Sequence, residues 1–131
     1  MLAWLLGEDA GTAVGTALEE ADLVVTSDLT LLECARALHR AVSSAVLIES
    51  ESARLNATLR RLSGHWVLVR IDEDVLHRAS KPFPIEPVRT LDAIHLATAV
   101  SIMKTVGEVK LLSLDRRILE NGRALGFEVQ P

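Results

Sequence analysis

The sequence predicts an α/β protein with a largely parallel sheet. Short apolar runs rich in β-branched residues alternate along the chain with longer segments whose apolar residues recur at helical spacing. Such alternation is typical of strands that are joined by helical crossovers, which place consecutive strands parallel. Because no internal repeat, low-complexity tract or linker interrupts this pattern, we expect residues 1–131 to form a single domain.

The composition is that of an ordinary globular protein. Its 131 residues are 49% hydrophobic and 24% charged, which is enough for a substantial core. With 14 basic and 18 acidic residues the net charge is -4, which argues against a protein that coats nucleic acid by bulk electrostatics but leaves room for a local basic strip. The single cysteine, Cys34, cannot form an internal disulfide. No run reaches the roughly 18 apolar residues of a membrane span, and Met1 to Leu6 lacks the basic flank of a signal peptide, so we expect a soluble, cytoplasmic protein.

Each element of the first half follows from a local pattern. The run 23–26 is apolar and β-branched, which is typical of a buried parallel strand. Ser27 or Asp28 is expected to cap the helix that follows it, and the pair Ser43-Ser44 is expected to loosen the end of that helix. The predicted elements are a helical turn at 1–6, a helix at 10–21, a strand at 23–26, a helix that carries Leu31, Leu32, Ala35, Leu38 and Val42, and a polar helix at 48–62.

The second half is organised around one apolar helix. Pro82, Pro84 and Pro87 exclude helix before it, and Thr90 is the expected N-cap. The predicted elements are a strand at 66–71, a short helix at 72–80, a long helix from 90, a strand at 109–114, a helix at 116–125 and an extended ending at 127–129. The apolar residues of the long helix cover too wide an arc for a half-exposed helix, so we expect them to be buried: Leu91, Ile94, Ala97, Val100 and Ile102.

Three carboxylates are candidates for a shared site. Asp115 ends the strand 109–114, Glu33 lies on the helix entered from the strand 23–26, and Asp92 opens the apolar helix. Since ligands of open parallel sheets bind at the carboxyl ends of the strands, all three can reach one end of the sheet. Grouped carboxylates repel one another and require a cation, and oxygen ligands select Mg²⁺ or Mn²⁺. Such ions commonly serve phosphate chemistry.

Each candidate also has a structural explanation. Asp92 could stabilise the helix dipole, Asp115 could cap the last helix, and Glu33 could pair with Arg36 on a solvated face. His95, three residues after Asp92, is more often a satisfied core histidine than a ligand. The sequence contains no P-loop, no glycine-rich dinucleotide motif, no serine-hydrolase elbow and no Cys/His zinc spacing.

Three stretches, in the same order and spacing, resemble the PIN-domain family, especially toxins of the VapC type. Residues 91–99 (Leu-Asp-Ala-Ile-His-Leu-Ala-Thr-Ala) resemble the hallmark helix of that family. Residues 112–117, followed by 124–129, resemble its C-terminal acid motif. Residues 26–33 resemble its strand-then-helix segment, in which the glutamate is a site acid.

The resemblance implies a three-layer α/β/α sandwich and a Mg²⁺- or Mn²⁺-dependent ribonuclease, the toxin of a type II toxin–antitoxin system. By position, Glu33, Asp92 and Asp115 would be the metal-site acids, and Ser113 a neighbouring polar residue of the site. The expected partners are an RNA substrate, whose phosphodiester bonds would be hydrolysed, a cognate antitoxin and a second copy in a homodimer. Arginines on the two helices after residue 27 could contact phosphates or form a solvated basic face: Arg36, Arg40, Arg54, Arg60 and Arg61.

One departure from the family pattern leaves a second function open. Members of this family normally begin with a strand that ends in an aspartate, and residues 1–8 instead look like the helix that follows it, so the N-terminal strand and first acid are expected to be missing. The first interpretation is a ribonuclease that has retained three of its acids. The second is a non-catalytic module that binds RNA or an antitoxin.

Overall fold

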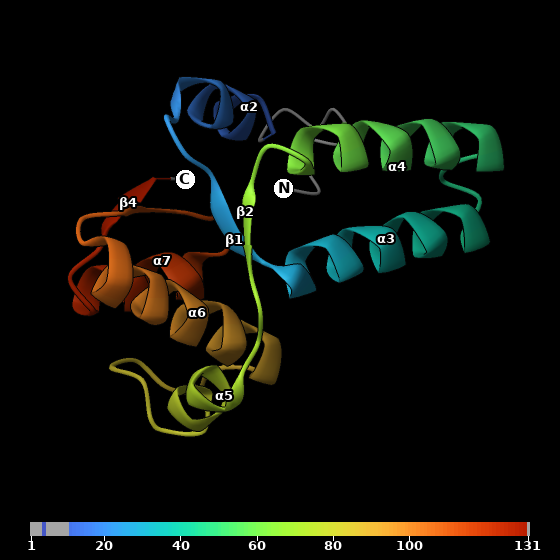
Figure 1. Cartoon of the computed structure of the whole chain (residues 1–131). Coiled ribbons are helices and arrows are strands. Elements are labelled where there is room, and N and C mark those ends of the chain that lie inside the picture. Colours follow the sequence, from blue (N-terminus) through green and yellow to red (C-terminus); the bar gives the residue numbers. More distant parts are fainter. Residues whose placement is uncertain (1–3, 5–10, 131) are drawn as a thin grey trace. The chain divides into compact units, whose positions relative to one another are not determined.

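The computed structural model describes residue 4 and residues 11–130 (Figure 1). The chain forms two compact units, Met1–Leu68 and Val69–Pro131, and each is described by itself. Trp4 is helical, and the rest of the helical turn expected at 1–6 lies outside the described residues. The expectation that the N-terminal strand is missing also lies outside them. The single domain expected from the sequence stays a prediction. Among the described helices, none is long and apolar enough to cross a membrane.

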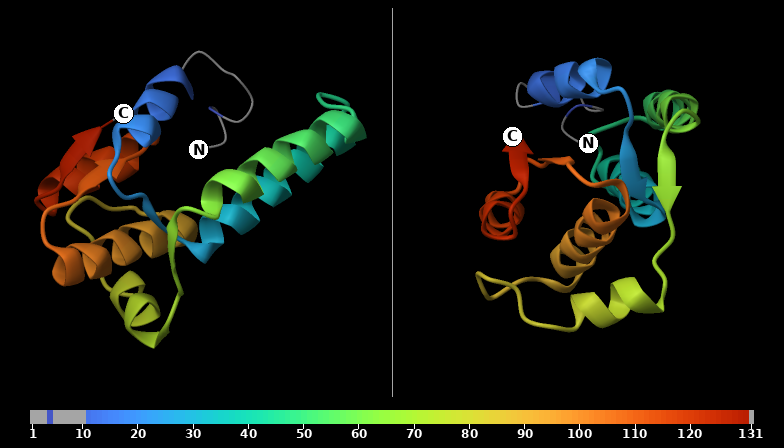
Figure 2. Two further views of the ribbon diagram at one scale, coloured as in Figure 1. Left: turned by 45° about the horizontal axis from the view of Figure 1, so that its top comes forward. Right: turned by 60° about the vertical axis from the view of Figure 1, so that its left-hand side comes forward.

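The first unit consists mainly of helices. Its elements are α2 (Gly11–Glu20), β1 (Val25–Ser27), α3 (Asp28–Ser43), α4 (Glu49–Ser63) and the start of β2 (Val67–Val69). The antiparallel pair α3 and α4 runs side by side in Figures 1 and 2. Ser43 and Ser44 donate hydroxyl hydrogen bonds to the carbonyls of His39 (2.9 Å) and Arg40 (2.8 Å), which agrees with the helix end predicted there.

The core of the first unit lies between α3 and α4. Cys34 and Leu59 are each 2% exposed, and Trp4, Leu31 and Trp66 pack against them. Burial raises the pKa of the Cys34 thiol. The cysteine therefore packs as a small apolar side chain.

The second unit combines three helices with a parallel strand pair. Its elements are α5 (Glu73–Ala79), α6 (Thr90–Val106), β3 (Lys110–Leu112), α7 (Arg116–Ala124) and β4 (Glu128–Gln130). β3 and β4 are parallel, with Leu111 opposite Val129, and α7 forms the crossover between them. α7 approaches this pair closely at the buried Gly122, where a Cβ atom would lie 2.5 Å from Leu111 Cδ2 and 3.1 Å from Val129 Cγ1. The described strands thus pair as β1 with β2 and β3 with β4.

One face of helix α6, and not its whole circumference, packs in the core of the second unit. The cluster comprises Val75, Phe83, Ala93, Leu96, Ala97 and Ile118. Leu91, predicted to be buried, is 46% exposed, so that part of the prediction was wrong. The predicted N-cap was also wrong, because Thr90 is already helical and the capping position is held by Arg89, whose side chain makes no cap hydrogen bond.

The proline-spaced loop before α6 is fixed by two polar side chains. Asn121 of α7, 1% exposed, accepts a hydrogen bond from the Ile85 amide (3.0 Å) and donates one to the Ile85 carbonyl (2.9 Å). The Glu86 carboxylate accepts from the amides of Phe83 (2.9 Å) and Val88 (2.6 Å), and these hydrogen bonds lower its pKa. The loop therefore delivers the chain to the start of α6 in one conformation.

Candidate metal centre

Asp92 lies in the first turn of α6, where the positive end of the helix dipole favours a negative charge. The residue is half-buried, and its Oδ2 atom is buried without a hydrogen-bond partner. A buried oxygen of this kind is costly, since most such atoms are hydrogen-bonded. A bound cation would satisfy it.

Asp115 is the N-cap of α7, as the sequence predicted. Its Oδ1 atom accepts hydrogen bonds from the amides of Arg117 (2.8 Å) and Ile118 (3.4 Å). The Asp115 amide in turn donates to the Ser113 hydroxyl (3.1 Å). These contacts fix an exposed carboxylate just beyond the end of β3, and they make Ser113 a residue that positions Asp115. The cap occupies one carboxylate oxygen, so capping and metal binding are compatible.

Glu33 belongs to the other unit. It is half-buried on α3, one residue before the buried Cys34. The structure joins Ser113 to Asp115 by a hydrogen bond and places Asp92 in the same unit as both. The convergence of Glu33 with the two aspartates stays a prediction, as does its alternative pairing with Arg36.

The donor set fits a hard divalent ion only in part. The unpartnered Asp92 oxygen and the immobilised Asp115 carboxylate are the kind of ligands that Mg²⁺ and Mn²⁺ prefer. However, within residue 4 and residues 11–130, no three His, Cys, Asp or Glu side chains form a group that could hold a metal ion. The described residues therefore offer two candidate metal ligands, Asp92 and Asp115, and no group of three.

Ser27 is a polar residue that sequence reasoning treated only as a helix cap. It occupies the N-cap position of α3, yet its side chain makes no cap hydrogen bond. The residue is 2% exposed and its Oγ atom is buried without a partner. Its place at the end of β1 was the available signal, because the same strand-end rule had selected Asp115.

Comparison with known proteins places these observations in a family. The PIN domain family matches residues 1–124, which includes nearly all of both units. Ribonuclease VapC46 of Mycobacterium tuberculosis is 43% identical over 94 residues, which cover 71% of this chain and 68% of that protein. The PIN domain is an α/β sandwich, so the predicted fold class is confirmed. The chain belongs to the PIN-domain family and is of the VapC type.

Proposed function

We propose that this protein is a metal-dependent endoribonuclease, the toxin of a type II toxin–antitoxin system. Its family and its 43% identity to a ribonuclease support this activity. PIN-domain ribonucleases of the VapC type generally depend on a divalent metal ion. The observation in the molecule that carries the proposal is the buried Asp92 Oδ2 atom, which has no hydrogen-bond partner and suits a cation.

The metal is Mg²⁺ or Mn²⁺, and Glu33, Asp92 and Asp115 hold it. Such an ion supplies Lewis-acid stabilisation of the charge that develops on the scissile phosphate. The chain's own contribution is to hold the acids in place. Asp92 is held in the first turn of a core helix, and Asp115 is immobilised by the cap of α7 and by Ser113.

The partners of this activity are an RNA and a protein. Toxins of the VapC type bind RNA and a cognate antitoxin, and we propose both for this chain. A homodimer is a further proposal, taken from the family. The exposed arginines of α3 and α4 are candidate phosphate contacts: Arg36, Arg40, Arg54, Arg60 and Arg61.

A second candidate is a non-catalytic module that binds RNA or an antitoxin. It is favoured by one observation, that the described residues form no group of three metal-binding side chains. The two functions differ in whether phosphodiester bonds are cut, so one assay separates them.

The test is cleavage of single-stranded RNA with Mg²⁺, with Mn²⁺ and with EDTA. The variants Glu33→Gln, Asp92→Asn and Asp115→Asn are compared with Asp22→Asn, which removes an exposed carboxylate elsewhere. We expect metal-dependent cleavage that each site variant lowers by about 100-fold or more, since a missing ligand removes several kcal/mol of transition-state stabilisation. If the wild-type chain cuts no RNA with either metal but still binds RNA or an antitoxin, the module is correct.

A further inference from the structure

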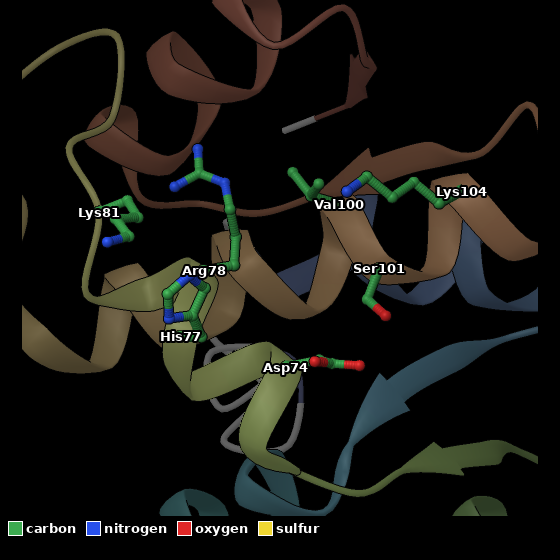
Figure 3. Close-up of a pocket in the computed structure, with 7 residues that line it drawn as sticks. All are labelled: Asp74, His77, Arg78, Lys81, Val100, Ser101 and Lys104. Atoms are coloured by element: carbon green, nitrogen blue, oxygen red, sulfur yellow. The ribbon is translucent and has the colours of Figure 1, made fainter.

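We propose that a basic hollow between α5 and α6 binds the phosphate backbone of the RNA, away from Asp92. The identity of this ligand rests on the proposed function. The hollow has a volume of about 450 Å³ and lies wholly within the second unit. Its lining residues, which define the basic hollow and are drawn in Figure 3, are Asp74, His77, Arg78, Lys81, Val100, Ser101 and Lys104.

The charge of the basic hollow is opposite to that of the whole chain. The lining contains three cations, Arg78, Lys81 and Lys104, and one carboxylate, Asp74, which gives a formal charge of +2 with His77 neutral. The chain as a whole carries -4. Because the Debye length is about 8 Å at physiological salt, distant carboxylates are screened and the local cations decide which ligand approaches. An acidic protein that holds a polyanion needs a surface of this kind.

Arg78 is held in place before any ligand arrives. Its guanidinium carbon lies 4.2 Å from the centroid of the Phe83 ring, which is 5% exposed and part of the core. Its Nη1 atom donates to the Pro82 carbonyl at 3.5 Å, a long hydrogen bond. A guanidinium has five N–H donors in a planar fork that matches the oxygens of a phosphate, and this hydrogen bond uses one of them. The stacking therefore lowers the entropy cost of binding an anion.

The two lysines complete the basic hollow from different elements. Figure 3 shows Arg78 on α5 and Lys104 on α6 extending toward the same side of the hollow, and Lys81 in the chain just after α5. Both lysines are exposed, and their stems give them reach. The lining contains no Phe, Tyr or Trp, the Phe83 ring next to Arg78 is buried, and the exposed His77 imidazole is the one ring in the lining that could stack on a base. Three cations and a single small ring favour contacts to phosphates, which position a nucleic acid, over base stacking.

Lys104, at one side of the basic hollow, is separated from Asp92 along α6. Lys104 follows Asp92 by twelve residues on the same helix, which corresponds to about 18 Å along its axis. An RNA that is held at both places must therefore extend over several nucleotides. The hollow would hold a remote part of the substrate, independently of sequence.

The experiment measures binding without cleavage. A fluorescently labelled single-stranded RNA of about 20 nucleotides is titrated in EDTA with wild-type protein and with Lys81→Gln/Lys104→Gln, over a series of salt concentrations. The matched control is Lys110→Gln/Arg123→Gln, which also removes two positive charges, from residues outside the basic hollow. The Lys110 side chain on β3 is 62% exposed and pairs with Glu128 at 2.8 Å, and Arg123 on α7 is exposed. For single-stranded RNA, the slope of log K against log salt changes by about 0.7 for each phosphate that the protein no longer neutralises. A slope change of about 0.7 alters the ratio of the affinities at 50 mM and 1 M salt roughly eightfold.

We expect the double variant to show the smaller slope and weaker binding for RNAs of unrelated sequence, and Lys81→Arg/Lys104→Arg to restore both. Equal slopes for Lys81→Gln/Lys104→Gln and Lys110→Gln/Arg123→Gln would overturn the proposal. A wild-type chain that binds no RNA at low salt would overturn it as well. An acidic partner protein would then be the better occupant. The experiments distinguish failure of the two proposals. If the chain cleaves RNA but the double variant leaves the slope unchanged, only the proposed role of the basic hollow is wrong. If the slope changes but the chain cleaves no RNA, only the proposed nuclease activity is wrong.

Discussion

Asn121 and Ile85 exchange two hydrogen bonds, in which the Asn121 side chain pairs with both backbone groups of Ile85. The same side chain donates to the Arg117 carbonyl at 3.2 Å within α7. A single buried amide therefore ties the loop that precedes the Asp92 helix to the helix that Asp115 caps.

Asn121→Ala should destabilise the protein by about 1–2 kcal/mol, because a side chain that is 1% exposed is lost and the partly buried Ile85 amide and carbonyl lose their partners. Urea unfolding measures the change. The control is Arg123→Ala, an exposed position on the same helix, which should stay within about 0.5 kcal/mol of the wild type. Equal effects of the two substitutions would show that the link is not needed for stability.

The Glu86 carboxylate should make stability depend on pH in the acid range. Its pKa in the folded protein is lowered from 4.5 by the amides of Phe83 and Val88, so its ionised form stabilises the fold. This contribution is complete above the unfolded pKa and is lost as the pH falls from about 4.5 through the folded pKa. Melting temperatures of wild type and Glu86→Gln should therefore approach one another on acidification and differ most near neutral pH. A constant difference between pH 3 and pH 7 would contradict this account.

Two substitutions of Asp115 should separate its role as the N-cap of α7 from its role as a metal ligand. In EDTA, Asp115→Ala should cost about 1 kcal/mol of unfolding free energy, whereas Asp115→Asn should cost little, because asparagine is an equally good N-cap. Chemical denaturation in EDTA gives both values. If Asp115→Asn is as destabilising as Asp115→Ala, the carboxylate charge contributes more than the cap.

Mn²⁺ should raise the melting temperature of the wild-type chain, and Asp92→Asn should abolish the response. A ligand at about 100 times its Kd stabilises the folded state by about 2.7 kcal/mol. In EDTA, the same substitution should be neutral or stabilising, because it removes a charge from a partly buried place where Oδ2 has no partner. Differential scanning fluorimetry with and without Mn²⁺ measures both effects. An unchanged melting temperature for the wild type at saturating Mn²⁺ would exclude the metal centre.

The sequence predicted the elements whose signals are local. Asp72 and Asp115 marked the starts of α5 and α7, and both side chains do accept cap hydrogen bonds. The strand predicted at 23–26 instead runs Val25–Ser27, since strand ends depend on pairing partners that a local pattern does not contain. For the same reason, periodicity identified α6 as apolar but could not tell that Leu91 would be left half-exposed.

The sequence predicted the individual residues of the candidate site but not their arrangement in space. The strand-end rule selected Asp115, Glu33 and Asp92, and the family resemblance added Ser113. Their convergence depends on how two units are arranged, which no spacing along the chain encodes. The sequence did not predict the basic hollow, because its cations are spread over a helix, a loop and another helix and form no cluster along the chain: Arg78, Lys81 and Lys104.

The close approach of α7 to β3 has a consequence for how this family can diverge. Because a Cβ atom at Gly122 would meet the Leu111 side chain at 2.5 Å, positions 122 and 111 share one small volume. Relatives that carry alanine or serine at the position of Gly122 should carry valine or alanine at that of Leu111, whereas either change alone should be rare. A lineage that enlarged only position 122 would have to turn the Leu111 side chain away, because its outer methyl group is the atom in contact. Covariation between these two apolar positions would then record how closely α7 packs on the strand pair.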